Sequence, residues 1–477
     1  MSLRHIAVAQ GDRALQAEDR TSTELQLLLH RAMQPSDVHK AILKERPVLE
    51  SVGRLDFEGP DPATLRVEAM ASGTLICAPE DMAFRDLFPA LDVGVYCANH
   101  AVGKPSVASR MAVQQFLSQF EVFGVEGFMK AGWIELMEDA RHLMGELCGD
   151  PGLVRGDVTW FGNTSDALSA TLNSLSGRLV TTQGYFTTGH YVHGHWGQRD
   201  GNRVVTVPYD KAECVPAERV VAALTADTEV VSLSLVNWRS AHVHDMQAIC
   251  AAMADVCPHA ALVLNVTQSL GTIPVPADVL PPRTALVGTG MKQLRAGTGT
   301  GYAWFSHELL RDLRPDRTGW WAHEAPIDFD PGPMRWAAGA ARLRTGTQAL
   351  VPLVRLVTEL KVLAASGEHG DVTSGVRRAR RVTSELVAAA RDRALLLGLR
   401  VRGPVSVARR AAFIAVEVND GPGVYGALAA AGVVADFRSD EQGGSTGIIR
   451  VSASAAHFDY ELEHVIDLIA NAEGHLD

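Results

Sequence analysis

The 477-residue sequence lacks the features that would place it in a membrane or on a nucleic acid. No stretch approaches the roughly 18 consecutive apolar residues that a membrane-spanning helix needs. The first residues lack the basic-then-apolar pattern of a secretory signal, so we expect a cytoplasmic protein. The formal net charge is −11, from 44 basic and 55 acidic residues. Because phosphate backbones bind basic surfaces, this charge gives a nucleic-acid partner no support. A soluble globular protein is expected.

The sequence also has no closely spaced cysteine pairs and few lysines. The six cysteines include no CxxC pair, and most lie in apolar or helical stretches. We therefore expect free, mostly buried thiols, with neither a zinc site nor a disulfide framework. Lysine is rare beside arginine, so a lysine in an apolar context is informative. The lysines are Lys40, Lys44, Lys104, Lys130, Lys211, Lys292 and Lys361.

The pattern of apolar residues predicts an α/β protein with two domains. Between residues 158 and 305, short apolar runs alternate with helical patterns, which is typical of a mostly parallel sheet between helices. Long helices after residue 349 lead to a few short strands, which indicates a smaller α+β domain. We expect an N-terminal extension over 1–90 that packs on the body, a large domain over 91–348 and a small C-terminal domain over 349–477.

The element boundaries follow from the same patterns. Strands are expected at 158–161, 178–182, 204–208, 230–236, 261–266, 285–287, 301–305, 413–418, 433–437 and 448–451. Helices are expected at 106–120, 132–148, 166–175, 217–224, 246–256, 350–365 and 372–396.

In open α/β sheets, ligands bind beyond the carboxyl ends of the strands. Thr164 and Ser165 follow the first expected strand, where they could form a phosphate cradle or a plain helix N-cap. Asn265 ends a buried strand, and Gln268 lies three residues further on. Both could bind a ligand or simply face solvent.

Lys292 follows another buried strand and is flanked by apolar Met291 and Leu294. Removal from water lowers a lysine pKa and leaves a nucleophilic amine, although a lone lysine is more often a solvated loop residue. The glycine-rich run 296–301 lets the backbone approach a ligand, but it lacks the GxGxxG spacing of a dinucleotide site. Arg450 lies within an apolar strand, where its guanidinium would suit a carboxylate.

Along the chain, the possible phosphate cradle comes first, followed by the asparagine and the lysine at strand ends and then by Arg450 near the C-terminus. This order resembles that of one protein family. From about Tyr96 to Leu468, the chain is similar to fold-type I pyridoxal-phosphate (PLP) enzymes of the class V aminotransferase group, and most of all to kynureninases. The motifs that carry the resemblance are FGVEGF at 123–128 with Gly132 and Trp133, VNWRS at 236–240 with HDMQA at 244–248, GWWAH at 319–323 and TGTQ at 345–348.

The resemblance implies PLP as cofactor and a role for each matching position. Lys292 would hold PLP covalently and act as the catalytic base, and Arg450 would bind the substrate α-carboxylate. Trp320 and Thr347 would reach the phosphate of the neighbouring subunit, which implies a homodimer with shared active sites. The remaining cofactor-binding positions would be Thr164, Ser165, Phe186 (stacked on the ring), Ser234, Asn265 and Gln268.

The chain departs from the family at several of these positions. Asn265 stands where the family places an aspartate against the pyridine nitrogen. A neutral amide can hydrogen-bond this nitrogen but cannot stabilise its positive charge comparably. Met291 replaces a phosphate-binding tyrosine, the acidic residue of the ring-stacking loop is replaced near Gly189 and His190, and Gln268 is an accepted class V variant of the kynureninase histidine.

His190, His193 and His195 have a spacing that could bring imidazoles together. Without an aspartate or cysteine at known metal-site spacings, we favour exposed histidines, then a substrate-facing loop, and a metal least of all. No metal is expected. His242 and His244 are expected to be turn residues ahead of the helix near Asp245.

The sequence thus predicts a PLP-dependent lyase of the C–S type or a decarboxylating deaminase. Such an enzyme would act at Cα and Cβ of an S-substituted cysteine in specialised antibiotic metabolism, as kynureninase-like proteins do in lincosamide assembly. Three alternatives remain: a kynureninase-type hydrolase, a non-catalytic ligand-binding protein of the PLP fold, and a nucleotide-binding α/β protein that uses residues 297–301.

Overall fold

The computed structural model describes residues 82–88, 91 and 94–475, and it divides into two units. The described part of the first unit is residues 117–131, which include the end of α5 (Val107–Phe123) and α6 (Gly127–Lys130). The second unit holds the rest of the described chain and contains both sheets and the candidate site. Among the helices that the structure describes, none is long and apolar enough to cross a membrane.

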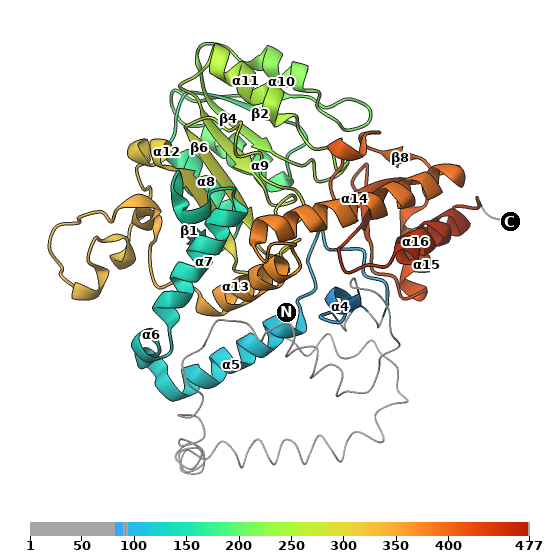
Figure 1. Cartoon of the computed structure of the whole chain (residues 1–477). Coiled ribbons are helices and arrows are strands. Elements are labelled where there is room, and N and C mark those ends of the chain that lie inside the picture. Colours follow the sequence, from blue (N-terminus) through green and yellow to red (C-terminus); the bar gives the residue numbers. More distant parts are fainter. Residues whose placement is uncertain (1–81, 89–90, 92–93, 476–477) are drawn as a thin grey trace. The chain divides into compact units, whose positions relative to one another are not determined.

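A seven-stranded sheet forms the centre of the second unit, in the order β1-β7-β6-β5-β4-β2-β3 (Figure 1). All neighbouring strands are parallel except β7, which runs antiparallel to β1 and β6. The mostly parallel sheet expected from the sequence is therefore confirmed. Its strands are β1 (Gly156–Phe161), β2 (Arg178–Thr182), β3 (Arg203–Val207), β4 (Thr228–Ser234), β5 (Ala261–Asn265), β6 (Thr284–Thr289) and β7 (Gly301–Ser306).

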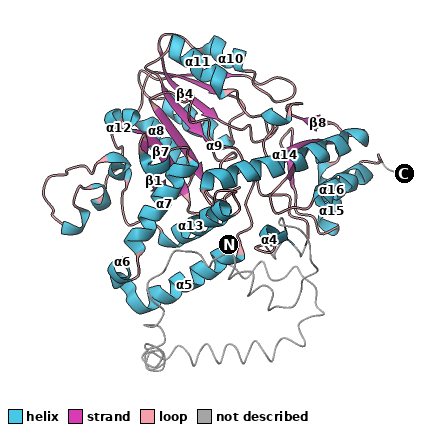
Figure 2. Cartoon of the chain, viewed as in Figure 1, coloured by secondary structure: helices cyan, strands magenta, loops and turns pink. Residues whose placement is uncertain are grey.

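Both faces of the central strands are buried, because side chains that alternate along them are covered on each side. On one face, Val263 and Val287 belong to an apolar cluster with Leu168 of α8 and Trp196 of α9. On the other face, Leu264 and Leu286 are also inaccessible to solvent. Figure 2 shows helices around the magenta strands. The helices of this part are α7 (Trp133–Leu147), α8 (Thr164–Asn173), α9 (Thr187–Gly197), α10 (Ala217–Ala223), α11 (Met246–Val256) and α12 (His307–Asp312).

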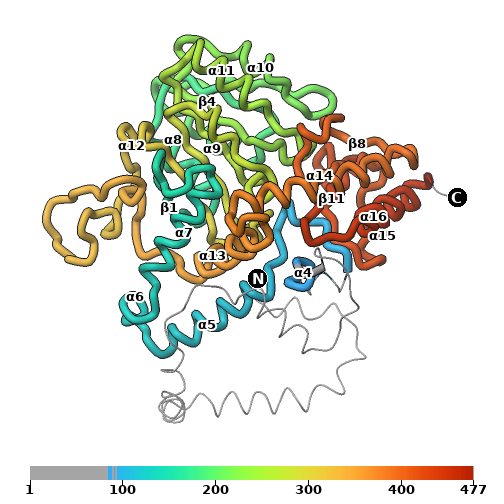
Figure 3. Tube along the Cα trace, viewed as in Figure 1, coloured from blue at the N-terminus to red at the C-terminus, as the bar shows by residue number. Residues whose placement is uncertain are grey.

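The C-terminal part contains a second, smaller sheet of four antiparallel strands in the order β10-β11-β9-β8. Its buried side chains form an apolar cluster with those of α14 and α16, drawn in orange and red in Figure 3. This agrees with the expected smaller α+β domain, while the boundary at residue 348 stays a prediction. The elements are α13 (Leu350–Ala365), α14 (Val372–Leu396), β8 (Val401–Arg402), β9 (Phe413–Val418), α15 (Gly421–Ala430), β10 (Asp436–Ser439), β11 (Gly447–Ser452) and α16 (Asp459–Ala472).

Most of the predicted extension, residues 1–81 and 89–90, lies outside the described residues. Its described end begins with α4 (Met82–Arg85), and Phe84 and Phe88 pack in an apolar cluster with Val362 and Ala456. Five of the six cysteines are described; all five are free, and four of them are buried.

Two local predictions need correction. The histidine-containing segment after β2 is the helix α9 rather than a loop. The strand expected from residue 433 begins at Asp436, because the preceding residues form an isolated bridge between Val434 and Tyr96.

Candidate active site

The carboxyl ends of β1, β2, β4, β5 and β6 lie at one edge of the central sheet, because these strands run in the same direction. Most of the residues singled out from the sequence lie in the segments that follow these strands. Ser234 and Asn265 are the last residues of β4 and β5 and are register partners. This edge is therefore the candidate active site.

Lys292 follows β6 and carries its amine into the site. Its Nζ donates a hydrogen bond to the main-chain oxygen of His100 at 3.1 Å and lies 5.7 Å from the centre of the Phe186 ring. Burial, assisted by nearby Arg450 and opposed by Asp436, lowers the pKa of Lys292 from 10.5 to about 8. A minor but larger than usual fraction of the amine is thus uncharged near neutral pH, and the uncharged amine is the form that a nucleophile requires.

The N-terminus of α8 carries the hydroxyl groups that the sequence predicts as an anion cradle, a role that stays a prediction. The helix is capped by Asn163, whose side chain accepts the main-chain N–H of Asp166. The hydroxyl of Thr164 lies 3.1 Å from that of Thr267, and the hydroxyl of Ser165 lies 3.2 Å from that of Thr188. Thr267, after β5, and Thr188, in the first turn of α9, thus bring hydroxyl groups to the N-terminus of α8, where the helix dipole favours an anion.

The glycine run 297–301 supports this cradle instead of forming a nucleotide loop. It leads into β7, whereas a dinucleotide loop would open a helix. A Cβ on Gly301 would lie 2.5 Å from the main-chain nitrogen of Asn163. Glycine at this position therefore lets β7 lie against the start of α8.

Asn265 and Gln268 lie three positions apart in the sequence, and both are buried. The Asn265 Oδ1 accepts the main-chain N–H of Thr267 at 2.9 Å, so its Nδ2 group is the one that can donate, either to the nearby Tyr185 hydroxyl or to a ligand. The Gln268 Nε2 donates to the main-chain oxygen of His100 at 3.0 Å, and its buried Oε1 has no partner among the described residues. A buried oxygen without a partner is expected where a ligand completes the hydrogen bonding.

Phe186 and Trp238 form an aromatic wall beside Lys292. Their rings meet edge to face, with centres 5.3 Å apart. Phe186 is 44% exposed, which leaves its ring available for stacking on a planar ligand. Trp238 belongs to the VNWRS motif at 236–240, and the sequence did not predict a role for it.

Arg450 is buried at 3% exposure and is already paired within the protein. Its Nε donates to Asp436 Oδ2 at 2.6 Å, its Nη2 also contacts Asp436, and its Nη1 donates to the main-chain oxygen of Trp238 at 2.6 Å. The His100 ring lies 3.4 Å from the same Asp436 oxygen. Sequence reasoning missed Asp436 and His100, since no motif links two residues that are 336 positions apart.

The other predicted positions lie apart from Lys292 or are engaged locally. The Ser234 hydroxyl donates to the main-chain oxygen of Val236. Trp320 is 41% exposed, and Thr347 is also exposed, in segments after β7. Such exposure is compatible with a role toward a second subunit, which stays a prediction.

The three histidines of α9 have separate environments. His193 is buried and its Nε2 lies 2.8 Å from the Ser232 hydroxyl, so the favoured expectation of exposed histidines is wrong for this residue. His190 and His195 are exposed. Among the described residues, no three His, Cys, Asp or Glu side chains are arranged to hold a metal ion. His242 and His244 precede α11 and are buried, but His242 forms an isolated bridge with Arg410, so the expectation of a turn is wrong for this residue.

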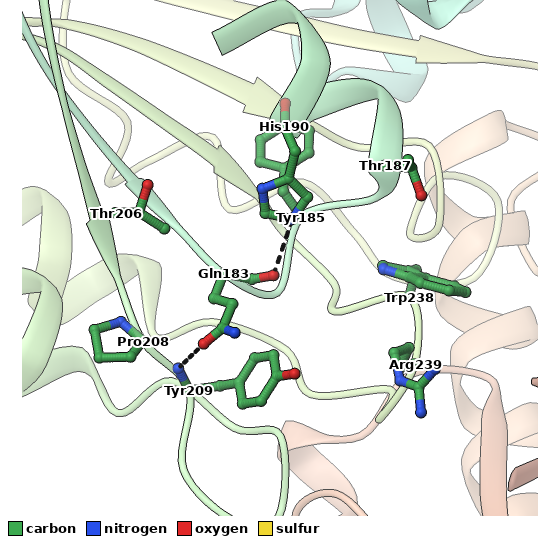
Figure 4. A pocket seen from close by; sticks show the side chains of 9 residues that line it. All are labelled: Gln183, Tyr185, Thr187, His190, Thr206, Pro208, Tyr209, Trp238 and Arg239. Carbon is green, nitrogen blue, oxygen red and sulfur yellow. Dashed lines mark hydrogen bonds between the residues drawn. The ribbon is translucent and has the colours of Figure 1, made fainter. Parts of the chain in front are cut away.

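A cavity of about 570 Å³ lies beside the aromatic wall. Figure 4 shows Gln183 between His190 and Tyr209, with Trp238 and Arg239 across from them. Trp238 also stands 5.2 Å from the Arg450 guanidinium, so one side chain borders both the cavity and the Arg450 cluster. The cavity could receive a substrate side chain.

Comparisons with known proteins show which sequences and folds the chain resembles. No family model matches the chain. A kynureninase of Pseudomonas fluorescens is 27% identical over 360 residues, which cover 73% of this chain and 83% of the relative. A kynureninase of Burkholderia pseudomallei strain K96243 is 26% identical over 371 residues, with the same coverage.

The solved structures that resemble the chain share its fold at low identity. The apo cysteine desulfurase of Thermococcus onnurineus NA1 superimposes with a TM-score of 0.71 at 16% identity, covering 84% of this chain and all of that one. The cystine C-S lyase C-DES, in complex with its product cysteine persulfide, has a TM-score of 0.70 at 17% identity and covers 80% of this chain and 99% of its own. Another C-DES structure carries glycine covalently linked to the PLP cofactor.

The fold and these similarities support a fold-type I, class V aminotransferase-like protein. Within this class, the chain is kynureninase-like in sequence. The relatives and structural neighbours indicate pyridoxal 5′-phosphate as the cofactor. They support a PLP-dependent lyase or hydrolase with an amino-acid substrate.

Proposed function

We propose that this protein is a PLP-dependent enzyme that acts at Cα and Cβ of an S-substituted cysteine. The reaction would be β-elimination or decarboxylation-dependent oxidative deamination, in specialised antibiotic metabolism. The observation that carries the proposal is the partly uncharged amine of Lys292, which lies between the Phe186 ring and the cluster of Arg450. When bound, PLP supplies an electron sink for charge that develops at Cα.

The residues present fit this cofactor. The hydroxyls of Thr164 and Ser165 at the start of α8 would hold the phosphate, and Phe186 would stack on the ring. Asn265 would donate its Nδ2 hydrogen to the ring nitrogen, and the unpartnered Gln268 Oε1 would accept from the ring hydroxyl. Ser234 is the register partner of Asn265 on the neighbouring strand and would lie near the cofactor.

The side chains then have distinct tasks on the substrate. The Lys292 amine would take the proton from Cα, since its lowered pKa of about 8 suits proton transfer near neutral pH. In β-elimination, the Cβ–S bond breaks and the sulfur leaves as a thiolate. Arg450 and the charged groups around it would hold the α-carboxylate. The cavity beside Trp238 would take the substituent on sulfur.

A product analysis tests this proposal. The purified protein is incubated with a panel of S-substituted cysteines and with kynurenine, in air and under nitrogen. Pyruvate with a free thiol indicates β-elimination, and carbon dioxide with an aldehyde formed only in air indicates oxidative deamination. Lys292→Ala should abolish turnover, whereas Lys361→Ala, on α13, should not. Turnover that survives Lys292→Ala would contradict the proposal, and no turnover at all would favour a non-catalytic protein.

A second candidate is a kynureninase-type hydrolase, which the sequence relatives favour. Anthranilate and alanine from kynurenine in the same assay would identify it. Asn265 argues against an unmodified kynureninase reaction, because a neutral amide stabilises a charged ring nitrogen less than the family aspartate.

We further propose that the enzyme is a cytoplasmic homodimer. The exposed Trp320 and Thr347 would reach the phosphate of the other subunit. Mixed dimers of a Lys292→Ala chain and a Thr347→Ala chain test this directly. If the sites are shared, both defects fall in one of the two sites, which leaves the other site fully competent.

A further inference from the structure

Three charged side chains lie on one face of the β10–β11 hairpin. Asp436 is the register partner of Arg450, and Arg438 follows Asp436 by two residues, which places it on the same face of the sheet. All three charges act on the pKa of the Lys292 amine, which Arg450 and Arg438 lower and Asp436 raises. This face of the hairpin is therefore directed at the candidate active site.

Arg450 has little capacity left for a ligand. The side of its guanidinium that carries Nε and Nη2 binds Asp436, and its Nη1 binds the Trp238 carbonyl oxygen. A carboxylate that sought the same two donors would have to displace Asp436. Moreover, the charges of Arg450 and Asp436 cancel as a pair.

Arg438 has the properties that Arg450 lacks. Its side chain is 44% exposed, and one nitrogen, Nη2, pairs with Asp436 Oδ1 at 2.8 Å. This is the only ion pair that the described residues give it, so its remaining donors are open to a ligand. Arg438 also supplies the net positive charge of the group, since burial lowers the pKa of His100 to about 3 and keeps that ring neutral.

Two other arginines near this face are already neutralised. Arg239 pairs with Glu213 and Asp440, and Arg402 pairs with the same two carboxylates. Neither offers an uncompensated charge to a substrate.

We propose that Arg438 selects the substrate α-carboxylate, as the exposed member of a two-arginine receptor that Asp436 holds together. This inference rests on the proposed function. The carboxylate contacts the open donors of Arg438, while Asp436 fixes the guanidinium of Arg438 against Arg450. An amine without the carboxylate loses this contact, so Arg438 sets the preference for amino acids over amines.

The test compares S-methyl-L-cysteine with S-methylcysteamine, which differs by the missing carboxylate. The dissociation constant of each is measured from the absorbance change of the PLP-loaded protein, and the ratio of the two constants reports recognition of the carboxylate. Arg438→Gln should reduce this ratio by about tenfold or more, the range expected for a charge-assisted hydrogen bond. The matched control is Arg400→Gln in the same domain, whose side chain is 77% exposed and pairs with Glu417.

Asp436→Asn supplies a second readout that a structural role would not give. Asparagine keeps an oxygen that can accept hydrogen bonds from the arginines but removes the negative charge that compensates them. S-methyl-L-cysteine should therefore bind more tightly to Asp436→Asn, whereas Arg438→Gln makes it bind more weakly; weaker binding to Asp436→Asn would contradict the inference. If Arg438→Gln binds PLP but leaves the ratio of the two dissociation constants unchanged, the inference about Arg438 is wrong while the proposed function stands. A protein without PLP absorbance, or one that neither compound perturbs, overturns the proposed function itself.

Discussion

Replacement of Asn265 by aspartate tests how this site controls its cofactor. Asn265 Oδ1 is held by the main-chain N–H of Thr267, so only its Nδ2 group can face the ring nitrogen. An N–H donor requires an acceptor, and the ring nitrogen accepts only when it carries no proton. We therefore predict that the ring nitrogen is unprotonated in the native protein and becomes protonated in Asn265→Asp.

The magnitude follows from elementary electrostatics. Two opposite unit charges about 4 Å apart interact by about 4 kcal/mol at an effective dielectric constant near 20, which corresponds to a pKa change of about 3 units. Asn265 is 6% exposed, so burial of the new carboxylate opposes part of this gain, whereas the Thr267 N–H favours the charged carboxylate. We expect the ring-nitrogen pKa to rise by about 2 units.

The assay is the ¹⁵N chemical shift of PLP labelled at the ring nitrogen, measured across pH in both proteins. This measurement reports the proton directly and does not depend on turnover. The matched control is Asn202→Asp, in which Oδ1 also accepts a main-chain N–H at 2.9 Å, but at the opposite edge of the sheet before β3. The control should leave the shift unchanged.

Equal ¹⁵N shifts in the native protein and Asn265→Asp would refute the reasoning. In that case, Asn265 would only terminate β5 and bind the following loop. A ring nitrogen already protonated in the native protein would refute the assigned direction of the amide.

Three further predictions concern the same molecule. Borohydride reduction of the yellow protein should fix the pyridoxyl group on Lys292 in peptide mapping, because its amine is the one with a pKa lowered to about 8; a label on Lys211 or Lys361 would contradict this. Arg450→Lys should keep the cofactor colour but raise KM for an amino-acid substrate about tenfold, because lysine keeps the charge but loses the planar guanidinium that binds Asp436, the residue that also holds Arg438; an unchanged KM would exclude a role for Arg450 in the carboxylate receptor. Burial lowers the pKa of both His193 and His244 from 6.5 to about 3. Only the unfolded chain then binds these protons between about pH 6.5 and 3, so stability should fall as pH drops through that window. Thermal unfolding of His193→Gln should show a shallower decline, and an equal slope would argue against a buried neutral His193.

The sequence alone was sufficient for much of the fold. Apolar runs such as ALVL at 261–264 predict buried parallel strands, and the structure confirms them. Strands that are buried on both faces carry apolar residues without alternation, which makes them easy to recognise. The helix α9 was missed since its residues, TTGHYVHGHWG, contain three glycines and no clear apolar stripe. Its burial of Trp196 against Leu172 and Leu175 is a tertiary effect.

The candidate site divides in the same way. Thr164, Asn265 and Lys292 could be found from the sequence because each follows a recognisable strand, and parallel strands carry such residues to one edge. The cluster around Arg450 could not be found, because it joins His100 to a hairpin more than 330 positions later. Whether a buried arginine is open to a ligand depends on which carboxylate packs beside it, and here Asp436 on the neighbouring strand decides that. Local pattern thus determined which residues reach the site, whereas the pairing of distant strands decided which of their charges remain available.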